Sequence, residues 1–155
     1  MKQAAALLAR RRWSRADLGA RLERAGAGVP VAPVLDRLEQ LDLLNDADYA
    51  YTFALRRIER QGWGPSRVEA ALRRSGVAPP VVETALGRAR EELGEDSGLG
   101  AEIDRLLARR GVPRTPAEAR SFAAALARRG FDPDRITGAL GRLLPAALAR
   151  RLETG

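Results

Sequence analysis

Arginine is the residue type through which this chain is best equipped to do chemistry. All but one of its 27 basic residues are arginines, the exception being Lys2, and the formal charge is +7 with a pI near 11.1. A guanidinium group binds a carboxylate or a phosphate through paired hydrogen bonds. This balance suits a polyanionic partner, either nucleic acid or an acidic protein surface. A GC-rich genome also favours arginine over lysine, so the charge indicates a class of partner without identifying it.

The positive charge is concentrated in the middle and C-terminal parts of the chain. Residues 1–50 hold eight basic and seven acidic residues, for +1. Residues 51–90 hold eight and three, for +5, and residues 101–155 hold eleven and six, also for +5. The candidate partner-binding residues are the arginines expected on exposed helix faces of these two parts: Arg56, Arg57, Arg60, Arg67, Arg73, Arg74, Arg109, Arg110, Arg128 and Arg129. A cation near a helix C-terminus is favourable in any case, so a structural role is the alternative for several of them.

Residues for acid–base, nucleophilic or metal chemistry are scarce. The chain has no histidine and no cysteine, which excludes Cys/His zinc sites, thiol nucleophiles and triads with an imidazole base. It also lacks the glycine-rich loop ending in Gly-Lys-Ser/Thr that binds phosphates. The best carboxylate group is Asn45-Asp46-Ala47-Asp48, and its place at an expected helix start favours capping over catalysis. We therefore expect no enzyme activity, no cofactor, no metal and no small-molecule substrate.

An internal repeat organises the elements that must position these side chains. An offset of 50 residues places eight residues of the first part on identical residues of the middle part, among them Trp13 on Trp63. A second offset of 54 residues places Gly76 on Gly130. Three copies of one unit therefore fill the chain. Because the two tryptophans are equivalent, packing between helices is a better interpretation of their rings than stacking on exposed bases.

Each copy is expected to form three helices, because its apolar residues recur at spacings of three and four. The middle helices have start signals at Ser14, Gly64 and Thr115 and end at glycines suited to a left-handed cap: Gly26, Gly76 and Gly130. Eight and four residues before each glycine lie the expected buried pairs: Leu18 and Leu22, Val68 and Leu72, Phe122 and Leu126. The inward residues of the third helices are expected to be Val34, Leu35, Leu38, Val82, Leu86, Ile136, Leu140 and Leu143. With no alternating strand pattern, the predicted fold class is all-α, an elongated array of three tandem three-helix repeats.

The expected repeats are residues 1–44, 45–94 and 95–155. A flexible linker rich in glycine and acidic residues, 93–100, is expected before the third repeat. No stretch approaches the roughly 20 apolar residues that span a bilayer, and the N-terminus lacks the pattern of a signal peptide. We therefore expect a monomeric, cytoplasmic protein without membrane contact.

Four short runs, in this order along the chain, are typical of one protein family. They are Asn45-Asp46-Ala47-Asp48-Tyr49-Ala50, Arg60-Gln61-Gly62-Trp63-Gly64-Pro65-Ser66-Arg67-Val68, Leu72-Arg73-Arg74-Ser75-Gly76-Val77 and Leu126-Ala127-Arg128-Arg129-Gly130-Phe131. The chain resembles the RecX family, whose members similarly have an acidic pair before Tyr-Ala, then Arg-x-Gly-x-Gly-Pro, then helices ending in Gly-Ile or Gly-Val and in Arg-Gly-Phe. One departure is that the usual Asp-Asp is Asn45-Asp46 here, a conservative change for a helix start.

The resemblance implies a partner and a role. The partner is the RecA recombinase, with single- or double-stranded DNA contacted through its backbone. A RecX protein is expected to lie along the helical groove of a RecA–DNA filament and to inhibit RecA ATPase, strand exchange and the coprotease activity that triggers the SOS response.

The residues themselves leave one alternative, a protein that binds DNA directly and without sequence preference. Small three-helix units with exposed arginines are also how helix-turn-helix domains look. Residues that read adenine edges are scarce, with one asparagine and three glutamines in the chain. Such binding would therefore be directed to the backbone and sensitive to salt.

Overall fold

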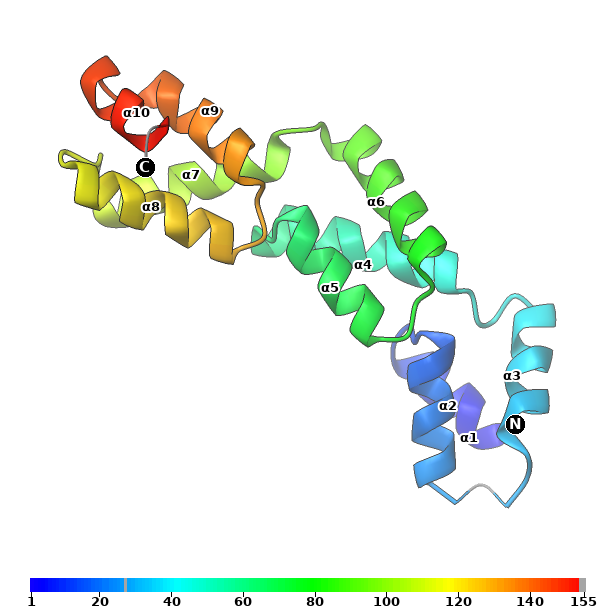
Figure 1. Cartoon of the computed structure of the whole chain (residues 1–155). Helices are drawn as coiled ribbons and strands as arrows, with labels where there is room; N and C mark the ends of the chain where they lie inside the picture. Colours follow the sequence, from blue (N-terminus) through cyan, green and yellow to red (C-terminus); the bar gives the residue numbers. More distant parts are fainter. Residues whose placement is uncertain (27, 154–155) are drawn as a thin grey trace. The chain divides into compact units, whose positions relative to one another are not determined.

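The computed structural model of the chain, described for residues 1–26 and 28–153, is built of α-helices (Figure 1). Over these residues no strand occurs and ten helices follow one another: α1 (Lys2–Arg10), α2 (Arg15–Arg24), α3 (Val31–Gln40), α4 (Asp46–Gln61), α5 (Pro65–Arg74), α6 (Pro79–Leu93), α7 (Ser97–Arg110), α8 (Pro116–Arg128), α9 (Pro133–Leu143) and α10 (Ala146–Glu153). The predicted all-α fold class is confirmed.

The order of the helices follows the internal repeat, with one addition. Helices α1–α3, α4–α6 and α7–α9 correspond to the three helices expected in each copy. Helix α10 was not predicted, so the described residues from 95 to 153 hold four helices instead of three. The repeat boundaries at 1–44, 45–94 and 95–155 stay a prediction.

The chain forms two compact units. Unit 1 comprises Met1–Ala54 and Glu69–Ala89, and unit 2 comprises Leu55–Val68 and Arg90–Gly155. The chain passes from one unit to the other inside α4, α5 and α6. Each unit has a core of its own.

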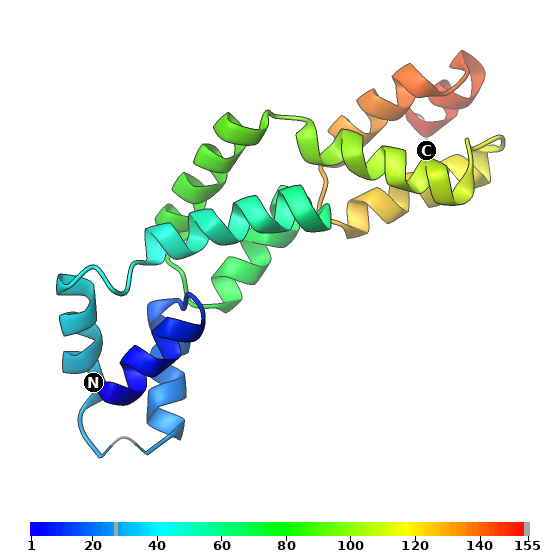
Figure 2. The same ribbon diagram turned by 180° about the vertical axis from the view of Figure 1, so that it is seen from behind.

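In unit 1, α1 packs on α2 and α2 packs on α3, and the three helices lie together in both views (Figure 1 and Figure 2). Their core is a cluster of aliphatic side chains: Ala4, Leu18, Leu22, Leu35, Leu38 and Leu44. The other helical segments of the unit add further buried residues: Ala50, Ala54, Leu72, Val82, Ala85 and Ala89. Burying one leucine side chain stabilises a fold by about 1.5–3 kcal/mol, so these small sets account for much of the unit's stability.

In unit 2, α8 packs on α7, α9 and α10, and α10 also packs on α9 (Figure 1). The core cluster is larger than that of α1–α3: Leu99, Ile103, Leu106, Ala119, Phe122, Ala125, Leu126, Phe131, Ile136, Leu140 and Leu144. Helix α10 covers it with the partly buried side chains of Leu148 and Leu152. The added helix therefore closes a core that three helices alone would leave open.

The predicted buried pairs of the middle helices are confirmed. All six side chains are at most 3% exposed: Leu18, Leu22, Val68, Leu72, Phe122 and Leu126. One prediction for the third helices was wrong, and two hold only in part. Leu143 is 52% exposed, because α9 ends there and the extended residue Leu144 enters the core instead. Val34 and Leu86 are half-buried. Beside Leu86, the small residues Ala85 and Ala89 take the inner face of α6.

The helix ends largely follow the predicted capping chemistry. Thr115 and Glu118 form a reciprocal capping box at the start of α8. Ser14 caps α2 by accepting from the Asp17 N–H at 3.1 Å. The glycines at the ends of α5 and α8 have φ of +75° and +93° and are followed by N–H groups that donate back to Leu72 and Leu126.

The predicted linker 93–100 is shorter in the structure. Helix α6 continues to Leu93 and α7 begins at Ser97, so helix occupies both ends of the segment. Arg135 of α9 binds the intervening turn by donating to the Glu95 carbonyl at 2.9 Å and pairing with the Asp96 carboxylate at 3.1 Å. The flexibility expected for this linker stays a prediction.

Candidate interaction site

Trp63 is the centre of an arginine cluster in unit 2. It lies half-buried in the turn between α4 and α5. The guanidinium carbon of Arg67 lies 4.0 Å from the centre of its ring, and that of Arg57 lies 4.7 Å away. A guanidinium over an indole face is attracted by the negative potential of the ring. Two of the predicted arginines, from different helices, are therefore held at one aromatic side chain.

The sequence Gly-Trp-Gly-Pro explains how this turn presents its tryptophan. Helix α4 ends at Gln61, and Gly62 has a φ of +62°, a conformation that favours glycine. The Trp63 N–H then donates to the Arg57 carbonyl at 3.1 Å, which brings the tryptophan back beside Arg57. Pro65 begins α5 at the first helical position, where its missing N–H is not needed.

The same turn docks, backbone against backbone, on the turn between α8 and α9. The Gly64 N–H donates to the Arg129 carbonyl at 2.6 Å, and the Ser66 N–H donates to the Gly130 carbonyl at 3.1 Å. A Cβ atom at Gly64 would lie closer than 3.0 Å to the Gly130 backbone, and one at Gly130 would lie 2.5 Å from the Arg67 nitrogen. Both positions therefore require glycine, because the two backbones lie too close together to leave space for a Cβ atom. This contact is named the Gly64–Arg129 junction.

A buried carboxylate lies against this junction. The Glu102 side chain is 1% exposed; its Oε2 accepts from Arg105 at 2.9 Å and its Oε1 from Arg129 at 2.8 Å. Burying a charge is costly unless it is paired, and here one carboxylate has two guanidinium partners. Arg129, which was predicted to bind a partner molecule, thus forms an ion pair within the chain.

Sequence reasoning missed Glu102 and Arg105, although a signal for Glu102 was present. Leu99, Ile103 and Leu106 form the buried stripe of α7, and position 102 falls on the same stripe three residues after Leu99. A glutamate at a core position of an amphipathic helix predicts a buried ion pair. Its partner Arg129 lies 27 positions away and is identified only by the fold.

Eight of the ten predicted arginines, Arg67 among them, are exposed. Six of them are exposed in unit 2: Arg56, Arg60, Arg67, Arg109, Arg110 and Arg128. Two are exposed in unit 1, where Arg73 pairs with Glu69 at 2.7 Å beside Arg74. An exposed pair within one helix contributes little to stability and does not prevent either arginine from binding elsewhere. The structure brings Arg57, Arg67 and Arg129 together around the Trp63 turn.

Unit 1 contains a related contact, named the Ser14–Ser75 junction. The Ser14 hydroxyl is fully buried and donates to the Ser75 carbonyl at 2.6 Å. The Tyr49 hydroxyl approaches the Ser75 hydroxyl at 3.5 Å. A Cβ atom at Gly76 would collide with the side chain of Ala16. Hydroxyl groups and small residues close this junction.

Arg15, next to that junction, forms ion pairs with two carboxylates. The Arg15 guanidinium pairs with Asp36 at 2.7 Å and with Glu39 at 2.6 Å, and the Arg15 backbone N–H donates to the Asp46 carboxylate at 2.7 Å. The hydrogen bond that Arg15 donates to Asp36, followed by the charge of Glu39, raises the pKa of the Arg15 guanidinium above its ordinary value. Asn45 caps α4 by accepting from the Asp48 N–H at 3.1 Å, so the Asn45–Asp48 run serves helix starts as predicted.

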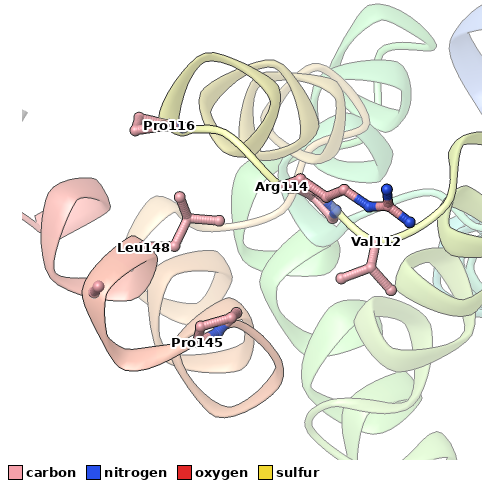
Figure 3. Close-up of a pocket in the computed structure, with 7 residues that line it drawn as sticks. Val112, Arg114, Pro116, Pro145 and Leu148 are labelled. Atoms are coloured by element: carbon pink, nitrogen blue, oxygen red, sulfur yellow. The ribbon is translucent and has the colours of Figure 1, made fainter.

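A pocket of about 520 Å³ lies in unit 2 between the α7–α8 loop and α10 (Figure 3). Its lining is mainly apolar: Val112, Pro113, Arg114, Pro116, Pro145, Ala147 and Leu148. The labelled side chain of Arg114 extends away from Leu148 (Figure 3). Such a lining supplies neither a general base nor a nucleophile.

The described residues also lack a metal-binding cluster and a membrane-spanning helix. Across residues 1–26 and 28–153, no three His, Cys, Asp or Glu side chains gather where they would hold a metal ion. Over the same residues no helix combines the length and apolar character needed to cross a membrane. The arginines gathered around Trp63 are therefore the candidate interaction site.

Comparison with known proteins gives a consistent result. A family sequence model described as RecX, second three-helix domain, matches residues 45–86. The chain is 37% identical to regulatory protein RecX of Halorhodospira halophila, over 86% of this chain and 81% of the relative. It is 34% identical to regulatory protein RecX of Pseudomonas putida, over 89% and 84%. The crystal structure of RecX from Lactobacillus salivarius matches with a TM-score of 0.78 over 92% of both chains, at 20% identity, and so shares the fold.

Proposed function

The chain belongs to the RecX family, and on this basis we propose that it binds RecA and RecA–DNA filaments and inhibits RecA ATPase, strand exchange and coprotease activity. Family membership is the observation that carries the proposal. The relatives are named regulatory proteins, which supports binding over catalysis as the mode of action.

The proposed binding residues are the arginines identified from the charge distribution: Arg56, Arg57, Arg60, Arg67, Arg73, Arg74, Arg109, Arg110, Arg128 and Arg129. Among these, Arg57 and Arg67 have the best-supported role. Their stacking on Trp63 restricts both side chains before any partner arrives. An arginine that is already ordered loses less rotamer entropy on binding a carboxylate or phosphate. Arg129 contributes through its internal ion pair and its carbonyl, which hold the turn.

Direct, sequence-nonspecific binding of DNA is the second candidate function. It is favoured by the net charge of +7 and by the exposed arginines of unit 2. The two functions make different predictions about salt. Contacts to the DNA backbone release counterions, so affinity for bare DNA falls steeply as salt rises. Binding to a protein surface that combines ion pairs with apolar contacts falls less steeply.

The test is to measure affinity for RecA filaments and for the same DNA without RecA at two salt concentrations. We expect filament binding to persist at the higher salt, while affinity for bare DNA falls by about 10³-fold or more between roughly 50 and 200 mM. Equal affinities for bare and RecA-coated DNA at both salt concentrations would support the DNA-binding alternative and contradict RecA recognition.

A further inference from the structure

The buried carboxylate of Glu102 lies next to the surface proposed to bind RecA, yet its burial prevents it from touching a partner. We propose that Glu102 is a positioning residue, which holds the Trp63 turn so that Arg57 and Arg67 are presented in the geometry that partner binding requires. This inference rests on the proposed function and adds a residue to it.

The first contact between Glu102 and the turn is steric. Gly62 directly precedes Trp63, and a Cβ atom at Gly62 would collide with the Glu102 Oε2 and with an Arg105 nitrogen. The carboxylate therefore lies against the backbone of the turn, with no side chain between them. If Glu102 moved, the packing around Gly62 would change.

The second contact runs through Arg129. Its guanidinium donates to Glu102 Oε1 at 2.8 Å, and its carbonyl accepts from the Gly64 N–H at 2.6 Å. Gly64 is the residue after Trp63. Glu102 thus acts on both neighbours of the tryptophan, directly at Gly62 and through Arg129 at Gly64.

Stability alone is a weak reason for a carboxylate at this position. Leu99, Ile103 and Leu106 surround it on α7, and an apolar side chain there would extend the same stripe without a desolvation cost. The charged residue does something that an apolar one cannot, which is to orient two guanidinium groups at fixed distances. In some proteins, buried polar or ionic groups serve to specify one arrangement of the chain.

The experiment compares Glu102→Gln with the parent chain, both in a Trp13→Phe background so that fluorescence reports on Trp63 alone. Three quantities are measured in the full-length chain: the thermal midpoint by circular dichroism, acrylamide quenching of Trp63, and affinity for RecA filaments. Asp104→Asn is the matched control, because it removes an exposed carboxylate two residues along the same helix. Arg129→Lys is a milder second variant that keeps the charge and loses the planar fork.

We expect Glu102→Gln to raise the quenching constant of Trp63 and to weaken RecA binding by about two- to tenfold, at temperatures where the chain remains folded. Arg129→Lys should change both in the same direction by less, and Asp104→Asn should change neither. If Glu102→Gln does not fold, the comparison of Arg129→Lys with Asp104→Asn decides. A lowered thermal midpoint with unchanged Trp63 quenching would overturn the positioning role. Absence of RecA binding by the parent would instead refute the proposed function, and the quenching data would still test the position of the turn.

Discussion

The Ser14–Ser75 junction of unit 1 and the Gly64–Arg129 junction of unit 2 occupy equivalent places in the repeat but are held by different chemistry. The offset of 50 residues places Ser14 on Gly64, and the offset of 54 places Ser75 on Arg129. In the first junction a serine hydroxyl donates to the Ser75 carbonyl, and in the second a backbone N–H donates to the Arg129 carbonyl. The repeat therefore preserves the acceptor carbonyl, while the donor group and the surrounding charges differ.

The side chains around the two tryptophans differ in the same way. At the offset of 50, Arg57 and Arg67 of the Trp63 turn correspond to Leu7 and Asp17 beside Trp13. The Trp13 indole donates to the Leu7 carbonyl at 3.2 Å and has Arg11 over its ring. The common turn is thus a structural feature of the repeat. The pair of arginines that brackets the tryptophan in the sequence is particular to the second copy, where the charge rises to +5.

The largest effect that sharpens this comparison is expected from alanine at the glycines that end the middle helices. Gly130→Ala should cost about 3–4 kcal/mol, because it combines a strained φ with a collision against the Arg67 backbone. Gly76→Ala should cost about 2–3 kcal/mol, since the colliding group is the Ala16 side chain. Gly26→Ala should cost about 1–2 kcal/mol, from φ alone, because the space there is open.

Urea denaturation followed by far-ultraviolet circular dichroism measures this series. Gly26 is the matched control, since it has the same place in the repeat and a φ of +65°. Equal losses for the three variants would mean that backbone conformation alone explains the glycines and that neither junction is tightly packed.

A smaller difference in stability is expected between two N-cap residues, Ser14 and Thr115, because only Ser14 also forms a junction. Ser14→Ala should cost about 2 kcal/mol, because it removes the cap of α2 and leaves the Ser75 carbonyl without its buried donor. Thr115→Ala should cost about 1 kcal/mol, because it removes the exposed capping box of α8 and nothing else. The same denaturation measurement applies, and a Thr115→Ala loss equal to or above that of Ser14→Ala would contradict a structural role for the Ser14–Ser75 bond.

Much of the fold could be predicted from the sequence, because local rules determine it. The buried pairs at Leu18 and Leu22 and their equivalents follow from helical spacing, and the terminal glycines follow from the φ they must adopt. Helix α10 escaped prediction because it extends the chain beyond the third copy of the repeat. Leu143 was misplaced because the end of α9 interrupts the helical phase one residue before Leu144 turns inward.

The candidate site was less predictable, because it depends on contacts between distant segments. Charge counts identified the arginine-rich parts, yet they could not tell that Arg129 pairs with Glu102 while Arg57 and Arg67 stack on Trp63. The packing expected for the tryptophans is confirmed for Trp13, which packs on the core of α1–α3. The ring of Trp63 instead has guanidinium neighbours from the two helices that flank its turn. Such arrangements follow from the fold and not from the local sequence.

The most direct test of the central claim is a titration of RecA's DNA-dependent ATPase with the parent chain and with an Arg57→Ala/Arg67→Ala variant whose helicity is verified by circular dichroism. The Arg73→Ala/Arg74→Ala pair, from the exposed surface of unit 1, is titrated alongside. The parent is predicted to inhibit hydrolysis, and the Arg57/Arg67 variant to need about tenfold more protein for the same inhibition. Unchanged hydrolysis at saturating parent chain would contradict RecA regulation. Equal inhibition by the parent and both arginine variants would contradict the assignment of binding to the basic surfaces.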